Sequence, residues 1–126
     1  MEGDIVKLRN EYTCPLEIVH DIIKGKWKTI ILFQLRNGAK SLSELEHEIQ
    51  GISQKMLLEQ LKELQMFGLV EKKVYPGYPL HVEYFLTNSR GEEMMKALNI
   101  MQQIGIDYLL ETGKEDLLRE KGLIKD

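Results

Sequence analysis

A helix that leads directly into a β-hairpin is encoded between residues 51 and 86, and this pairing narrows the possible folds more than any other feature. Three leucines recur with helical spacing and predict one buried face: Leu57, Leu61 and Leu64. Ser53 can cap the start of this helix, because its hydroxyl accepts a hydrogen bond from a first-turn N–H. Gly68 suits the left-handed conformation that commonly ends a helix.

The hairpin follows without a linker. Residues 69–75 and 80–86 are rich in β-branched and aromatic side chains, so each predicts a strand. Pro76-Gly77-Tyr78-Pro79 lies between them and predicts a loop longer than a tight turn, because proline cannot donate to a strand ladder. A helix that passes straight into such a hairpin is what a winged helix-turn-helix requires.

The preceding segments complete a helix-turn-helix. Two overlapping capping boxes predict the start of a helix that ends near Gln50: Ser41 with Glu44, and Ser43 with Glu46. Residues 27–35 are the most apolar stretch and predict a core helix that includes Trp27. Pro15 predicts the start of another helix with an inward apolar face formed by Leu16, Val19 and Ile22 or Ile23. A short helix is also predicted over residues 4–11.

Four motifs in this order closely resemble the HxlR-type transcriptional regulators, which are relatives of the MarR group: Cys14-Pro15-Leu16-Glu17, Gly25-Lys26-Trp27-Lys28, Gly51-Ile52-Ser53-Gln54-Lys55-Met56-Leu57, and Val74-Tyr75-Pro76 with Val82-Glu83-Tyr84. The resemblance covers residues 12–110. It implies a homodimeric, sequence-specific regulator of transcription, most often a repressor. Its partner would be double-stranded DNA with a pseudo-palindromic operator.

The expected fold is mainly α with a small β-wing (α+β), a winged helix-turn-helix with N- and C-terminal dimerisation helices. We predict four segments: residues 1–13 as an N-terminal dimer arm, 14–88 as the DNA-binding module, 89–112 as the dimerisation helix, and 113–126 as a polar tail with a possible short helix.

The DNA-binding prediction assigns roles by position. Gln54 and Lys55 occupy the first turn of the recognition helix, where glutamine can pair with adenine and lysine can donate to guanine. Phosphate contacts are predicted for Ser43, Ser53, Lys62, Lys72 and Lys73. Tyr78 and His81 are expected to enter or flank the minor groove from the wing. The alternative for Gln54, Lys55 and Lys62 is an ordinary solvated helix face.

Charge is unevenly distributed along a chain whose net charge is −3. Residues 22–81 carry nine lysines and arginines against six glutamates, so the predicted DNA module has a net charge of +3. DNA responds to this local excess rather than to the charge of the whole chain. Because the excess is weak, a dimer and base contacts must supply much of the affinity.

Cys14 is the only cysteine and the one candidate reactive centre. It precedes Pro15 and therefore lies at a helix N-terminus, which stabilises a thiolate. Lys24, Lys26 and Lys28 would add positive potential if the fold brings them close. The resemblance implies that a cysteine here senses oxidants or electrophiles such as quinones and aldehydes. The alternative is a small buried apolar residue.

The last long helix is predicted from the capping box Ser89 with Glu92 to about Leu110. A stripe recurs along it at alternating three- and four-residue spacing: Met94, Leu98, Met101, Ile104 or Gly105, and Tyr108. So small a domain leaves little core to cover this stripe, so we predict that a second copy of the chain does so. Packing against residues 4–23 of the same chain is the alternative.

The sequence offers no support for an enzyme, a cofactor or a metal site. It contains no Gly-rich phosphate loop, no nucleophile elbow and no paired-carboxylate motif, and its three histidines lack metal-ligand spacing. A single cysteine, no signal-peptide pattern and no long apolar run favour a cytoplasmic protein without a membrane partner. Two other functions stay open: the same fold responding to a small-molecule ligand, and a winged-helix protein-interaction module that binds no DNA.

Overall fold

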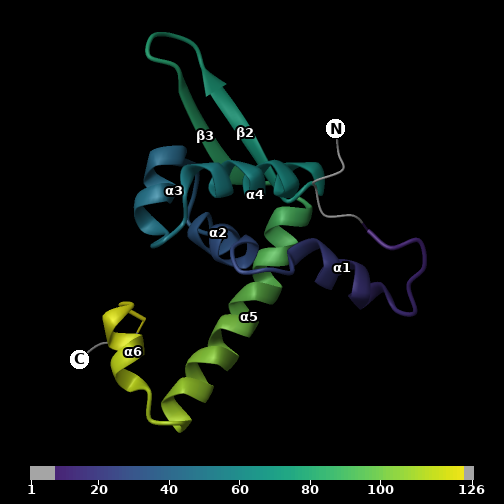
Figure 1. Cartoon of the computed structure of the whole chain (residues 1–126), viewed down its shortest axis with the longest axis vertical. Helices are drawn as coiled ribbons and strands as arrows, with labels where there is room; N and C mark the ends of the chain where they lie inside the picture. The colour runs from purple at the N-terminus through teal and green to yellow at the C-terminus, as the bar shows by residue number, and fades with distance from the viewer. Residues whose placement is uncertain (1–7, 124–126) are drawn as a thin grey trace. The chain divides into compact units, whose positions relative to one another are not determined.

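The computed structural model describes residues 8–123, and in this range it shows six helices and a three-stranded antiparallel sheet (Figure 1). In chain order the elements are α1 (Pro15–Ile23), α2 (Lys28–Gln34), β1 (Lys40–Ser41), α3 (Leu42–Glu48), α4 (Gln54–Met66), β2 (Val70–Tyr75), β3 (His81–Leu86), α5 (Arg90–Glu111) and α6 (Glu115–Glu120). The predicted fold class, mainly α with a small β-wing, is confirmed. None of the helices in this range is long and apolar enough to cross a bilayer.

The chain divides into two compact units, with the boundary inside α5 between Met95 and Lys96. The first unit holds α1 to α4, the sheet and the beginning of α5, while the second holds the rest of α5 together with α6. The predicted DNA-binding and dimerisation segments meet earlier, where α5 begins.

The core of the first unit forms where α2, α3 and α4 meet the sheet. Its fully buried side chains are Ile31, Leu32, Leu35, Leu45, Leu57, Leu61, Leu64, Leu69 and Val70. The predicted inward face of the recognition helix is therefore confirmed. Trp27 is only half-buried, and it is the N-cap of α2 rather than part of the helix.

The orientation of α1 differs from the sequence prediction. Leu16 was expected to face inward, yet it is 75% exposed. The buried residue of α1 is Asp21, which lies on the opposite side of the helix and pairs with Arg9. Residues 8–11 are not helical, so the predicted helix over 4–11 is wrong there, and residues 4–7 lie outside the described range.

Two helix starts are decided by one hydroxyl each. The Ser41–Glu44 capping box forms, since the Glu44 N–H donates to Ser41 Oγ at 3.2 Å and the Ser41 N–H donates to Glu44 Oε1 at 2.8 Å. Ser43 lies inside α3, so its predicted box is wrong. At α5 the first-turn hydroxyl is that of Thr87 rather than Ser89: the Gly91 N–H donates to Thr87 Oγ1 at 2.7 Å.

The hairpin of β2 and β3 forms the wing and projects beyond α3 and α4 in Figure 1. Its register runs from Val70 opposite Leu86 to Tyr75 opposite His81, which leaves residues 76–80 as the predicted wide loop. The third strand, β1, pairs with the other edge of β3. The sequence analysis missed β1, since two residues carry no periodicity.

Candidate nucleic-acid interface

The first turn of α4 presents the predicted base-reading residues to solvent. The Met56 N–H donates to Ser53 Oγ at 3.1 Å, so Ser53 is the N-cap that the sequence predicts. Gln54 and Lys55 follow it, and both are exposed. The Ser53 hydroxyl accepts this bond and keeps its own O–H free to donate, as a phosphate contact requires.

The end of α4 is held as firmly as its start. Gly68 has a φ of +76°, and the N–H of Leu69 donates to the carbonyl of Leu64 at 2.9 Å, which closes a Schellman motif. Arg90 adds a side-chain bond, since its Nη1 donates to the Phe67 carbonyl at 2.6 Å. The helix and the wing that follows it are therefore joined by a defined turn.

The predicted phosphate contacts on the helices lie on open surfaces. Lys62 is exposed and follows Lys55 by two helical turns, so the two lysines lie on one side of α4. Ser43 is exposed on α3, and its Oγ lies 3.3 Å from Ser41 Oγ.

Lys72 and Lys73 do not form one patch. They are neighbours on β2, so their side chains lie on opposite sides of the hairpin. Lys72 pairs with Tyr84 on the core side, whereas Lys73 pairs with Glu83 on the outer side and its Nζ lies 5.0 Å from the Tyr75 ring centroid.

A polar cluster covers the outer side of the wing. His81 Nε2 lies 3.0 Å from Glu83 Oε2, and the Tyr75 hydroxyl donates to Glu83 Oε1 at 3.2 Å. The hydrogen bond with His81 is the main reason why the pKa of Glu83 lies below its usual range. The carboxylate of Glu83 therefore lies beside His81, the residue predicted to approach the minor groove. The sequence analysis did not predict this contact.

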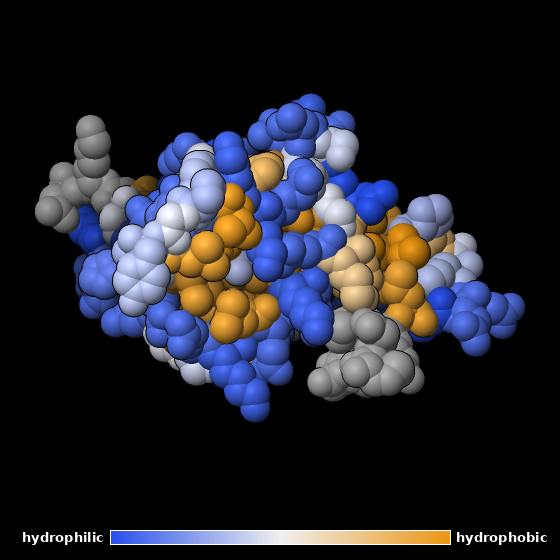
Figure 2. Space-filling model, turned by 90° about the horizontal axis from the view of Figure 1, so that it is seen from above, coloured by the Kyte–Doolittle hydropathy of each residue, from blue (hydrophilic) through white to orange (hydrophobic). Residues whose placement is uncertain are grey.

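The wing loop itself is open to solvent. Tyr78 is fully exposed, and Val74 and Leu80 are exposed apolar residues beside it. Figure 2 looks onto the molecule from the side of this loop and shows apolar side chains gathered between polar ones. Such a mixed surface can lie along sugars and bases as well as phosphates.

The predicted positive charge of the DNA module needs one correction. Lys28 is 2% exposed and pairs with Glu63 on α4, so neither residue is available to DNA. The excess of +3 is unchanged, because the pair removes one charge of each sign. Lys40 is also engaged, with its Nζ 2.8 Å from Glu48 Oε2.

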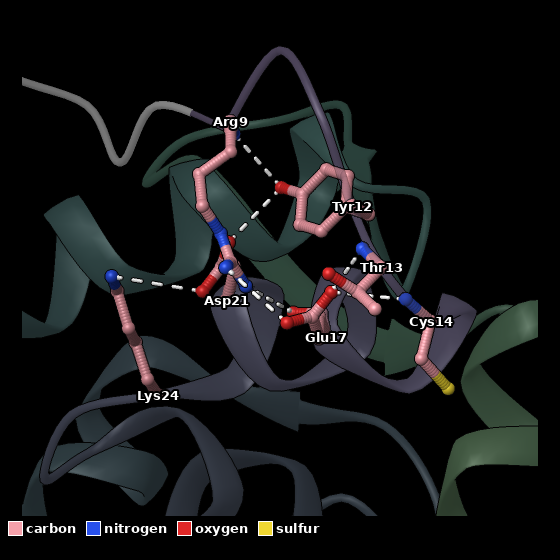
Figure 3. A network of polar contacts seen from close by, with 7 residues as sticks. All are labelled: Arg9, Tyr12, Thr13, Cys14, Glu17, Asp21 and Lys24. Atoms are coloured by element: carbon pink, nitrogen blue, oxygen red, sulfur yellow. Dashed lines mark hydrogen bonds and ion pairs between the residues drawn. The ribbon is translucent and has the colours of Figure 1, made fainter.

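Cys14 is exposed at the N-cap of α1, as the sensing prediction requires. Its own N–H donates to Glu17 Oε1 at 3.0 Å, and the N–H of Thr13 donates to the same atom at 2.5 Å. These two bonds are the main reason why the pKa of Glu17 is lowered. In Figure 3 the Sγ of Cys14 is directed away from the network.

The rest of this network fastens the N-terminal segment to α1 (Figure 3). Arg9 Nε lies 2.7 Å from Asp21 Oδ2, and the Tyr12 hydroxyl donates to the same oxygen at 3.0 Å. The bond from Arg9 is the main cause of the lowered pKa of Asp21. The segment that carries Cys14 is thus tied to the helix that follows it.

The lysines expected near Cys14 are engaged elsewhere. Lys24 Nζ lies 3.9 Å from Asp21, Lys26 lies over the Trp27 ring, and Lys28 pairs with Glu63. The charged group bonded to the backbone of Cys14 is instead the carboxylate of Glu17, which Arg9 partly offsets at 3.6 Å.

The apolar stripe of α5 is exposed over part of its length. Met101, Ile104 and Tyr108 are more than half exposed, and Ile100 joins them. Leu98 is 5% exposed and Met94 is half-buried, so these two residues are already covered within the chain. The exposed apolar surface of α5 is therefore smaller than the predicted stripe. It also includes Ile100, which the sequence analysis did not place in the stripe.

An open cleft of about 630 Å³ lies in the first unit. Its lining is mostly polar: Gln65, Gly68, Val70, Glu71, Thr87, Asn88, Ser89 and Arg90. Within residues 8–123 no cluster of three or more His, Cys, Asp or Glu is arranged to hold a metal ion.

Comparison with known proteins decides the family. The family model of the HxlR-like helix-turn-helix proteins matches residues 22–112. The chain belongs to this family. The predicted resemblance is thus confirmed, and this HxlR-like protein is a transcriptional regulator with a helix-turn-helix fold.

Its relatives include both sequences and solved structures. The HTH-type transcriptional regulator YkvN of Bacillus subtilis (strain 168) is 41% identical over 98 residues, which are 78% of this chain and 82% of YkvN. The redox regulator HypR in its reduced form is 35% identical with a TM-score of 0.73, over 79% of this chain and 99% of HypR. The reduced transcriptional regulator YodB of B. subtilis is also 35% identical, with a TM-score of 0.65, over 73% of this chain and 90% of YodB.

Proposed function

We propose that this HxlR-like regulator is a sequence-specific DNA-binding repressor that acts as a homodimer in the cytoplasm. The observation that carries the proposal is the first turn of α4, where Gln54 and Lys55 are exposed on a helix anchored by three fully buried leucines. A helix presented in this way can enter a major groove with its N-terminal side chains at base edges.

Base recognition and positioning fall to different residues in this proposal. Gln54 pairs with adenine and Lys55 donates to guanine, whereas Lys62, Lys72, Lys73, Ser43 and Ser53 contact phosphates. Tyr78 and His81 approach the minor groove from the wing. Phosphate contacts alone would leave binding weak, because the module has a net charge of only +3.

A second copy of the chain is the proposed partner of the exposed α5 stripe. Four large apolar side chains in solvent are unfavourable for a monomer: Ile100, Met101, Ile104 and Tyr108. A two-fold dimer would place two recognition helices about 34 Å apart, one turn of B-DNA. Each half of a pseudo-palindromic operator would then meet one α4.

Cys14 is the proposed sensor of oxidants or electrophiles. Its exposure and the redox regulator HypR among the structural relatives support this role. As the only cysteine, it can form a disulfide only with a partner subunit or a small thiol, or else accept an adduct. Either product would change the surface at the start of α1 and, in this proposal, shift the two α4 helices out of register with the half-sites.

The test of DNA binding uses the purified full chain and a labelled fragment of its own upstream DNA in fluorescence anisotropy. Lys55→Ala and Gln54→Ala should weaken specific binding by about tenfold or more, since a good bidentate base contact contributes about 1–3 kcal/mol. Lys114→Ala, which removes an exposed lysine outside the module, should change affinity less than twofold. Equal losses from Lys55 and Lys114 would contradict base reading by α4.

The test of sensing adds diamide or methylglyoxal to wild type and to Cys14→Ser. Release of DNA by wild type alone supports Cys14 as the sensor. Release of DNA by both proteins would contradict the role of Cys14 as the sensor. It would favour the small-ligand alternative, for which the cleft lined by Gln65 and Arg90 is the available site. Failure of wild type to bind any fragment of the source genome would favour the protein-interaction alternative.

A further inference from the structure

A buried ion pair joins the recognition helix to α2. Lys28 is the first residue of α2 and Glu63 lies near the end of α4, and their side chains are 2% and 9% exposed. Lys28 Nζ lies 2.6 Å from Glu63 Oε1, so the two charged groups are in direct contact, although within the described residues this oxygen accepts no well-oriented hydrogen bond.

Buried apolar residues flank both partners along their helices. Ile31 and Leu32 follow Lys28 on α2, Leu64 follows Glu63 on α4, and all three are essentially fully buried. Apolar contacts hold two helices together but resist small sliding and tilting poorly, because they have little directional preference. A short ion pair between buried groups, by contrast, depends strongly on the distance between its two charges.

Stability is a weak explanation for such a pair. Removing two charges from water is costly, and apolar residues of similar volume often serve a fold equally well or better. The pair is therefore better explained by what it fixes than by how strongly it stabilises.

Because Glu63 lies far from the first turn of α4, a small rotation of the helix at Glu63 moves the first turn by a larger distance. Gln54 lies nine residues before Glu63, which corresponds to about 13 Å along a helix. A tilt of about 5° at Glu63 would therefore move Gln54 by about 1 Å. A hydrogen bond to a base edge tolerates only about 0.5 Å.

We propose that the Lys28–Glu63 ion pair is a positioning device that sets the angle of α4 on α2, so that Gln54 and Lys55 meet base edges in register. Lys28 and Glu63 are thus positioning residues that touch no DNA themselves. The inference rests on the proposed DNA binding, and it deepens that function by assigning sequence discrimination to a buried contact.

The decisive variant is the double substitution Lys28→Met and Glu63→Met in the full chain. It removes one charge of each sign, so the net charge of −3 and the attraction to phosphates stay the same. The ratio of operator affinity to random-DNA affinity should fall at least tenfold, random-DNA affinity should change less than twofold, and the melting temperature should stay within a few degrees of wild type.

A matched control removes an exposed ion pair. Lys40→Met with Glu48→Met deletes a pair of 2.8 Å whose side chains are 24% and 32% exposed. This variant should keep the specificity ratio within twofold. A double Lys28/Glu63 variant that also keeps the ratio within twofold would overturn the proposal, as would a control variant that loses the ratio equally.

A measurement without DNA separates this inference from the proposed function. Amide NMR spectra of the double variant should show shifted or broadened signals for residues 54–57 in α4, with the melting temperature retained. Unchanged signals there would overturn the positioning role whether or not wild type binds DNA. Wild-type protein that binds no operator, combined with shifted signals, would remove the DNA proposal but keep the role of the pair in placing α4.

Discussion

Gly91 at the start of α5 should tolerate no side chain, even the methyl group of alanine. A Cβ at this position would lie 2.3 Å from the Leu69 carbonyl oxygen and 2.9 Å from Thr87 Oγ1. Real Cβ atoms essentially never come within 3.0 Å of another heavy atom, so the backbone of α5 must shift by about 0.7 Å. The obstructing atom belongs to backbone next to the buried Val70 and cannot rotate away.

The cost can be worked from these contacts. Overpacking of a well-packed site costs about 1–3 kcal/mol. The shift also strains the bond of 2.7 Å from the Gly91 N–H to Thr87 Oγ1, which adds about 1 kcal/mol. The higher helix propensity of alanine offsets about 1 kcal/mol of this loss of stability. The expected net loss is about 1–3 kcal/mol, or a fall in melting temperature of about 4–12 °C.

Circular dichroism during heating measures this effect, with all proteins at one concentration. The control is Gly105→Ala in the same helix, where a Cβ would meet nothing within 4 Å. That variant should gain up to about 1 kcal/mol from helix propensity alone. A fall of less than 2 °C for Gly91→Ala, or equal shifts for both variants, would refute the reasoning.

Three further predictions follow from the site. Ser53→Ala removes the N-cap bond to Met56 and should cost about 1 kcal/mol in urea denaturation, whereas the exposed Ser43→Ala, which caps no helix, should cost much less. Glu83→Gln should tighten binding to random DNA, because it removes a negative charge from the wing beside His81; weaker binding would contradict the placement of the wing on DNA. The pKa of Asp21 is lowered in the folded chain, so its stabilising contribution is present above the unfolded pKa of about 3.9 and is lost as the pH falls through the folded pKa. Wild type should therefore have a higher melting temperature than Asp21→Asn at pH 7, and this difference in melting temperature should disappear below about pH 4. A difference that stays constant with pH would mean that the Arg9–Asp21 charge pair is not its source.

Features that depend on a few neighbouring residues were predicted well from the sequence. Ser53 and Gly68 delimit α4 as expected, because capping and Schellman bonds join residues at most five positions apart. The leucine face of α4 and the two strands of the wing follow from periodicity and turn chemistry in the same way. The exposure of Gln54, Lys55 and Tyr78 was predictable for this reason.

Features that depend on distant segments were decided only by the tertiary structure. Lys28 was counted as a surface charge, and only the approach of a residue 35 positions later made it a buried partner of Glu63. Gly91 lies in the first turn of α5, but only the nearness of the Leu69 carbonyl in the fold requires this residue to be glycine. Leu98 and Ile104 belong to one apolar pattern, yet one is covered and the other exposed. A local pattern records which side chains share a face, whereas burial and pairing depend on which other segment packs against that face.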